Sequence, residues 1–281
     1  MIPYINIDFA LGDKVLSVTH TSMWRLVALT GIEAVDISPY IEDYASRDGA
    51  WYGGAKIGPR YITLTVECQP RKETEQARRE MIAFLQPRAD GTLTVTRSGI
   101  TRKIGVKLAA GASFSQPNIR QDRLVVTIQL VAPDPYWQDV EETEYEFVKR
   151  YPLLNFPFSP VATSGLIYTS DQIDIHNPGD VPAGIICRIE CSGGSTVNPA
   201  VNCGDRFVKA LTTLTEGDVL VFDTRSGHKG ITKNGVKANV FSPDSDFFQI
   251  PVGDSSVSVS ADSGISYCNT SLSYHFGYLG V

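Results

Sequence analysis

The stretch Gly58-Pro-Arg-Tyr-Ile-Thr-Leu-Thr-Val-Glu-Cys68 sets a pattern that recurs along most of this 281-residue chain. Between positions 61 and 68 an apolar side chain stands at every second residue, in alternation with mostly polar ones. Successive side chains of a β-strand point to opposite faces, so this segment predicts a strand with one buried face. Similar alternation recurs at residues 92–96, 103–108 and 124–130. Each apolar face needs a covering layer, which predicts a mainly β protein with sandwich packing.

One segment of the first half breaks this pattern and predicts a helix. Between residues 71 and 86 the apolar side chains recur with the spacing of one helix face, at Ala77, Met81 and Leu85, and Ile82 widens the stripe. Pro87 ends the segment, because proline cannot continue a helix. We therefore expect a helix over about residues 73–86, with its apolar stripe packed on the first domain.

The length and the middle of the chain indicate two domains. At roughly 150 residues per domain, 281 residues predict about two. Five prolines and four glutamates concentrate between residues 133 and 160, where no regular strand or helix is expected. We place a first domain at 1–138, a connector at 139–160 and a second domain at 161–281. Residues 1–140 carry 16 basic and 15 acidic side chains, whereas residues 141–281 carry 9 and 16, which also favours two different surfaces.

The second half is again a series of short strands. Alternating segments occur at residues 185–191, 219–222 and 268–276. Asn234-Gly235 is the strongest hairpin signal in the chain, because both residues accept the positive φ of a type I′ turn. Turn signals at this frequency are typical of a β-sandwich.

The five cysteines are expected to be reduced, small buried side chains. Their number is odd, and Cys187 and Cys191 fall on one face of a single predicted strand. Four residues along a strand span ~13 Å, which is beyond the reach of a disulfide. The sequence has no Cys-x-x-Cys pair to start a zinc site.

The sequence offers no constellation that would support catalysis. It has no Gly-x-Ser-x-Gly, Walker or His-Glu-x-x-His motif, and its four histidines stand far apart. Asp244, Asp246 and Asp254 could together hold calcium, but a solvated turn is the favoured interpretation. The net charge of −6 argues against nucleic-acid binding, and no apolar run is long enough for a membrane span. We expect no enzyme activity, cofactor or metal.

A glycine-rich stretch at about residues 45–60 predicts a bent hairpin arm. Trp51 and Tyr52 stand between Gly49 and the pair Gly53-Gly54, and no Lys-Ser/Thr follows as in a phosphate loop. Exposed aromatic side chains on an arm indicate a partner surface, and the alternative is that both rings fold back on their own domain. The candidate interface residues are Trp51, Tyr52, Gly53, Gly54 and Arg60.

A series of short motifs, in this order and spacing, resembles the distal tail proteins of long-tailed, siphovirus-type bacteriophages. In the first half they are Gly58-Pro-Arg-Tyr-Ile-Thr-Leu64, Leu85-x-Pro87, Gly91-Thr-Leu-Thr-Val95 and Ala132-Pro-Asp-Pro-Tyr-Trp137. In the second half they are Asn177-Pro-Gly-Asp-Val-Pro-Ala183, Gly217-Asp-Val-Leu-Val-Phe-Asp-Thr224, Asn234-Gly235 and Phe247-Phe-Gln-Ile-Pro-Val-Gly253. The resemblance runs nearly from end to end.

This resemblance implies a structural virion protein, assembled in the host bacterial cytoplasm and located at the phage tail tip. Members of the family form a hexameric ring that joins the tail tube protein to the tail-tip hub and carries receptor-binding proteins at its periphery. The resemblance also implies two β-sandwich-type domains. The first builds the ring and has one α-helix and a β-hairpin arm that grips the neighbouring subunit, and the second is galectin-like.

The alternative function is a host-surface binding module, in which the second domain recognises a glycan or a protein. The sugar site of galectins uses a His-x-Asn-x-Arg strand and a stacking tryptophan, and neither is matched here. All three tryptophans, Trp24, Trp51 and Trp137, precede the second domain. The fold alone does not supply a sugar-binding function.

Overall fold

The computed structural model of the chain describes residues 5–69, 74–115, 123–147 and 172–281. These residues form two compact units. Unit 1 comprises Met1–Val140 together with Tyr278–Val281, and unit 2 comprises Glu141–Gly277. The mainly β composition predicted from the sequence is confirmed, and the described residues include one α-helix, α1 (Thr74–Phe84).

The units differ from the expected domains at two places. The last four residues of the chain belong to unit 1, although the sequence placed them in the second domain. Strand β12 (Thr143–Phe147) lies in the expected connector but pairs with β23 (Cys268–Tyr274) of unit 2. Residues 148–160 of the expected connector lie outside the described residues.

Unit 1 is built on a ten-stranded sheet in the order β24-β11-β8-β7-β1-β2-β3-β6-β10-β9. These strands are β1 (Ile5–Leu11), β2 (Lys14–Val18), β3 (Trp24–Thr30), β6 (Arg60–Cys68), β7 (Gly91–Arg97), β8 (Ile100–Leu108), β9 (Ser113–Ser115), β10 (Val125–Ala132), β11 (Trp137–Asp139) and β24 (Gly277–Tyr278). Strand β6 is the segment quoted first above, and its alternate apolar residues, Ile62 to Cys68, are buried as predicted.

The sheet of unit 1 closes on itself, which the sequence did not predict. One edge of β10 pairs with β6, and its other edge pairs first with β9 and then with β8, through Leu130 opposite Leu108. Since β8 is joined through β7, β1, β2 and β3 to β6, the strands form a barrel-like ring around one core. The first domain is therefore a closed sheet rather than the expected sandwich.

Helix α1 packs on the core of unit 1 through one face. Ala77, Met81 and Phe84 are buried, and the rings of Phe84 and Phe9 meet edge to face at 5.5 Å between centroids. Ile82 was expected in this stripe, but it is 57% exposed, because the helix turns it away from the core. In the described ranges α1 is the only α-helix, and its 11 residues fall well short of the ~20 that cross a bilayer.

Unit 2 has a six-stranded and a four-stranded sheet, which contribute to one hydrophobic core. The six-stranded sheet, in order, contains β12, β23, β14 (Ile185–Cys191), β19 (Val219–Asp223), β20 (Gly230–Lys233) and β21 (Val236–Lys237). The four-stranded sheet contains β13 (Gln172–Asn177), β22 (Gly253–Ser260), β16 (Ala200–Cys203) and β17 (Arg206–Lys209). A small third sheet pairs β15 (Ser195–Val197) with β18 (Thr213–Thr215).

The hairpin predicted at Asn234-Gly235 is confirmed. It joins β20 to β21, and both residues have positive φ, 53° at Asn234 and 79° at Gly235. This is the geometry that a type I′ turn requires.

We expect Met81→Asp to destabilise the protein strongly. Met81 is 2% exposed, so the substitution would bury an unpaired charge at a cost of about 3 kcal/mol or more. Ile82→Asp is the matched control, since the neighbouring side chain is exposed on the same helix. Chemical denaturation of both variants would measure the difference, and equal stability of the two would contradict the packing of α1.

Candidate partner interface

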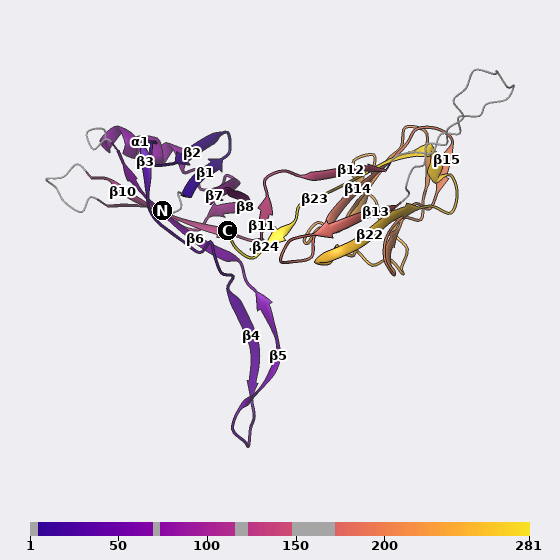
Figure 1. Ribbon diagram of the computed structural model, residues 1–281, viewed down its shortest axis with the longest axis horizontal. Coiled ribbons are helices and arrows are strands. Elements are labelled where there is room, and N and C mark those ends of the chain that lie inside the picture. The colour runs from indigo at the N-terminus through magenta and orange to yellow at the C-terminus, as the bar shows by residue number, and fades with distance from the viewer. Residues whose placement is uncertain (1–4, 70–73, 116–122, 148–171) are drawn as a thin grey trace. The chain divides into compact units, whose positions relative to one another are not determined.

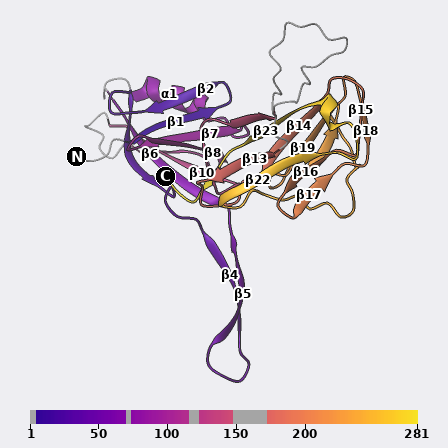
Figure 2. The same ribbon diagram turned by 45° about the vertical axis from the view of Figure 1, so that its right-hand side comes forward.

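The arm predicted from the glycine-rich stretch is a two-stranded ribbon formed by β4 (Ile37–Asp43) and β5 (Ala50–Ile57). Figure 1 shows both strands extending away from the rest of unit 1, and Figure 2 shows the same from a second angle. Every residue of β4 is exposed. The arm begins earlier than the expected residues 45–60, because its first strand precedes the glycine-rich stretch.

One face of the arm is apolar from Ile37 to Ile41. The register places Ile37 opposite Ile57, Pro39 opposite Ala55, and Ile41 opposite Tyr52. Residues that face one another across an antiparallel pair lie on the same side of the ribbon, so these six side chains form one stripe, which we call the arm stripe. Its large members are open to solvent: Ile37 is 61% exposed, Ile41 55% and Tyr52 61%.

The opposite face of the arm is held together by its own contacts. The rings of Tyr40 and Trp51 meet edge to face at 6.0 Å between centroids. Gly53 is the extra residue where the register shifts, and a Cβ atom there would lie 2.6 Å from carbons of both rings. The Tyr40 hydroxyl also hydrogen-bonds the Glu42 carboxylate, which raises the pKa of Tyr40. Glycine at position 53 is therefore what lets the two aromatic rings meet.

The structure separates the candidate residues predicted from the sequence. Trp51 and Tyr52 lie on opposite faces of the arm, and neither folds back on the core of unit 1, since they are 51% and 61% exposed. Gly53 makes room for the rings, and Gly54 has a φ of 128°, which favours glycine. Ile37 and Ile41 were missed, although their alternation with Ser38, Tyr40 and Glu42 is a strand signal.

Arg60 was also expected at the partner surface, but the structure places it inside unit 1. Its side chain is 1% exposed, and its guanidinium donates four hydrogen bonds to backbone carbonyls. The acceptors are the oxygens of Gly31 at 2.9 Å, Ala34 at 2.8 Å, Pro135 at 2.8 Å and Leu279 at 2.6 Å. Because the buried guanidinium is occupied by its own chain, Arg60 supports the arm rather than contacting a partner.

Arg60 lies at the base of the arm. Residues 31–34 lead into β4, and Arg60 begins the strand that follows β5. The amide of Gly58 also donates to the carbonyl of Asp36 at 3.0 Å, which closes the ribbon at this end. Both strands of the arm therefore start from one hydrogen-bonded point on unit 1.

The end of the chain is bound at the same place. Arg102 donates to the carbonyl of Gly280, and its guanidinium lies 3.6 Å from the centroid of the Tyr278 ring. The amide of Val281 donates to the carbonyl of Ile32 at 3.3 Å. These contacts explain why residues 278–281 belong to unit 1.

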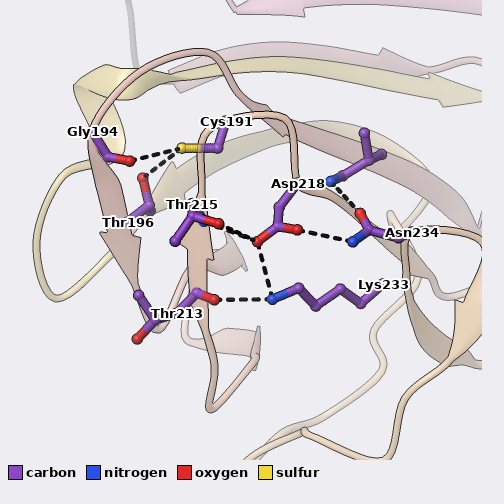
Figure 3. A network of polar contacts seen from close by, with 9 residues as sticks. Cys191, Gly194, Thr196, Thr213, Thr215, Asp218, Lys233 and Asn234 are labelled. Carbon is purple, nitrogen blue, oxygen red and sulfur yellow. Dashed lines mark hydrogen bonds and ion pairs between the residues drawn. The ribbon is translucent and has the colours of Figure 1, made fainter.

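In unit 2, a conspicuous polar cluster surrounds Asp218, within the Gly217–Thr224 motif (Figure 3). Its carboxylate accepts from the backbone and side chain of Thr215 at 2.9 and 3.0 Å and from Asn234 at 2.8 Å, and it lies 3.1 Å from the Lys233 ammonium. Asn234 in turn accepts from the amide of Val219 at 2.8 Å. These bonds, that from Asn234 foremost, lower the pKa of Asp218. The cluster joins the turn before Val219 to the turn at Asn234.

The other candidate for chemistry, the acidic strip, is not gathered into one site. Asp246 pairs with Arg206 at 2.6 Å, and Asp254 pairs with His176 at 2.7 Å. Across the described ranges, no group of three or more histidine, cysteine or acidic side chains is arranged to hold a metal ion.

Comparison with known protein families finds one match in each unit. Residues 178–278 match the family described as the siphovirus-type tail component, C-terminal domain. Residues 14–131 match the phage tail protein RIFT-related domain.

The chain belongs to the siphovirus-type tail components.

This tail component is thus a structural protein of the phage tail tip and not an enzyme, as the resemblance predicts. Among solved structures it is similar to the SPP1 Dit protein, described as a paradigm of the hub adsorption apparatus in phages that infect Gram-positive hosts. That similarity has a TM-score of 0.66 at 13% identity, over 97% of this chain and 99% of that one. A chain of the phage P2 baseplate in its activated conformation with calcium gives 0.52 at 12%, over 98% of each. No curated protein sequence matches.

We expect Asp218→Asn to lower the thermal stability of the tail component at neutral pH. The carboxylate has a lowered pKa in the folded state, so its contribution is fully present above the unfolded pKa of about 4 and is lost progressively as the pH falls from there through the folded-state pKa. The variant should therefore approach the parent protein in acid. Thermal melts at pH 7 and pH 3 measure this, with Asp205→Asn at an exposed turn as the control; a constant difference would contradict it.

Proposed function

We propose that this tail component forms a homo-hexameric ring at the distal end of the tail, in which each arm grips the neighbouring copy. Unit 1 builds the ring and joins the tail tube protein to the tail-tip hub. Unit 2, a galectin-like sandwich, carries receptor-binding proteins at the periphery. The observation that supports this proposal most directly is the arm stripe, an apolar surface on a ribbon with no core of its own.

The physics of the arm favours a covering partner. An isolated two-stranded ribbon is marginally stable in water, because it buries little apolar surface. Large apolar side chains gathered on one exposed face usually mark an interface. A covering surface would bury Ile37, Ile41 and Tyr52 together and stabilise the ribbon at the same time.

A second copy of the chain is the partner that can cover the apolar stripe of every arm. In a closed ring of identical subunits, each copy offers one arm and receives one, so no arm stripe is left in water. The nearly neutral charge of residues 1–140 lets such copies pack without strong repulsion. The excess of acidic residues in 141–281 favours a solvent-facing position for unit 2.

The wider set of partners rests on the relatives. The similar SPP1 protein is described as part of a hub adsorption apparatus, and the similar P2 chain comes from a baseplate. Both descriptions agree with a ring that connects the tube to the adsorption machinery. The alternative role, direct binding of host glycans or proteins by unit 2, predicts that purified unit 2 is retained on host cell walls.

We expect Ile41→Asp and Tyr52→Asp to dissociate the ring into smaller species. Each places a charge in the arm stripe, where it would lose its hydration on assembly. Ser38→Asp puts the same charge on the opposite face of the same ribbon and should leave assembly intact. Light scattering after gel filtration measures the mass, and unchanged melting temperatures show that the subunits stay folded. If all three variants have the same mass, the arm stripe is not part of the interface between subunits.

Replacing residues 141–276 by a short linker should leave ring formation intact. Strands β11 and β24 are neighbours in the sheet of unit 1, so the linker needs to span only a short gap. A chain cut at residue 140 is the informative comparison, because it also removes the Leu279 acceptor of Arg60 and should be less stable. Electron microscopy of the linked variant measures the outcome, and a ring formed instead by isolated unit 2 would reverse the roles of the two units.

A further inference from the structure

Two of the five cysteines face one another across neighbouring strands of unit 2. Strands β14 and β23 run antiparallel, and Cys191 lies directly opposite Cys268 at the end of their ladder. The amide of Ser192 donates to the carbonyl of Tyr267 at 2.8 Å, so the hydrogen bond lies beside this pair and not within it. Non-hydrogen-bonded pairs are the closer kind, with Cα atoms about 4.5 Å apart.

The two thiols also point to the same spot. Both side chains are buried, and the Thr196 hydroxyl lies 4.0 Å from the sulfur of Cys191 and 3.0 Å from that of Cys268. Figure 3 shows Cys191 turned toward Thr196 and Gly194. Disulfides span Cα separations of about 4.4–6.8 Å, and the separation typical of a non-hydrogen-bonded pair falls within this range.

The remaining cysteines have no such neighbour in their ladders. Cys187 lies opposite Leu272, Cys203 opposite Val257, and Cys68 opposite Trp24 in unit 1. The register of the strands therefore places only Cys191 and Cys268, among the five cysteines, directly opposite each other.

We propose that Cys191 and Cys268 are a redox pair, reduced during assembly and joined by a disulfide when the protein meets peroxide outside the cell. One thiolate attacks hydrogen peroxide, the O–O bond breaks, and a sulfenic acid and hydroxide form. The second thiolate attacks the sulfenic sulfur, the S–O bond breaks, and with the released proton the oxygen leaves as water. The two sulfurs are oxidised by two electrons and the peroxide is reduced to water.

The bond would act as a covalent staple in unit 2. It joins two adjacent inner strands of the six-stranded sheet and closes a loop from residue 191 to residue 268. A disulfide across so long a loop restricts the unfolded chain and so favours the folded one. Reduced thiols suit assembly in a reducing compartment, and the bond suits a particle in oxidising surroundings.

The test is thiol counting on the full-length protein before and after treatment with hydrogen peroxide. After denaturation and alkylation, mass spectrometry should find all five cysteines of the untreated protein alkylated, and two fewer after treatment. The treated protein should also yield a linked peptide pair containing Cys191 and Cys268. Its melting temperature should rise by several degrees and return when a reductant is added.

Matched variants make the assignment specific. Cys191→Ser and Cys268→Ser should form no disulfide and show no peroxide-dependent rise, whereas Cys203→Ser should retain both. Oxidation of Met23 to the sulfoxide reports that the oxidant acted. Five alkylated thiols after such treatment, a bond to any other cysteine, or a rise that persists in Cys191→Ser would each overturn the proposal.

Discussion

The fold of unit 1 depends on the hydrogen bonds that one buried guanidinium, that of Arg60, requires. Arg60 cannot lose its charge in the protein, and an unpaired N–H on a buried cation is costly, so its donors must find acceptors. It finds them in carbonyls at residues 31, 34, 135 and 279, which come from three separate parts of the chain. The start of β6, the entry to the arm and the returning end of the chain are thereby held at one point. A lysine lacks the planar fork that reaches several acceptors at once, so it could not do the same.

Unit 2 uses smaller polar side chains for the same purpose. Asn177 accepts from the amide of Gly179 at 2.9 Å and donates to the carbonyls of Val181 and Ile250. Thr224 accepts from the amide of Ile185 at 3.0 Å. These residues belong to the motifs that carry the family resemblance, and with Asp218 they fix turns and strand ends. The motifs of the resemblance therefore consist largely of residues that hold the backbone in place. This explains why they identify a structural family although they contain no catalytic residue.

Much of this architecture is readable from the sequence, where the information is local. The alternation around Ile62 predicts β6, the spacing of Ala77 and Met81 predicts α1, and Asn234-Gly235 predicts a hairpin. The closure of the sheet is not readable, because it depends on the distant pairing of Leu130 with Leu108. The glycines at positions 49, 53 and 54 indicate a bent hairpin but not where its first strand begins, and that strand, β4, contains Pro39, which an exposed edge strand tolerates. Arg60 resembles a surface residue in sequence, and only its distant acceptors reveal that it is buried.

Closing the sheet has a consequence for association. A strand at a sheet edge is a ready template for pairing with another chain, and a barrel removes most of its edges. The arm keeps the outer edges of both its strands and an apolar face. The surface of unit 1 that is suited to pairing with another chain is therefore concentrated in this ribbon. The bulge at Gly53 gives the two faces of that ribbon different contacts. Trp51 packs against Tyr40 within the arm, whereas Tyr52 lies on the arm stripe. The Tyr40–Trp51 contact on one face supports the ribbon, and the arm stripe on the other face is apolar. Together they allow a ribbon with no core of its own to present a defined surface to a neighbour.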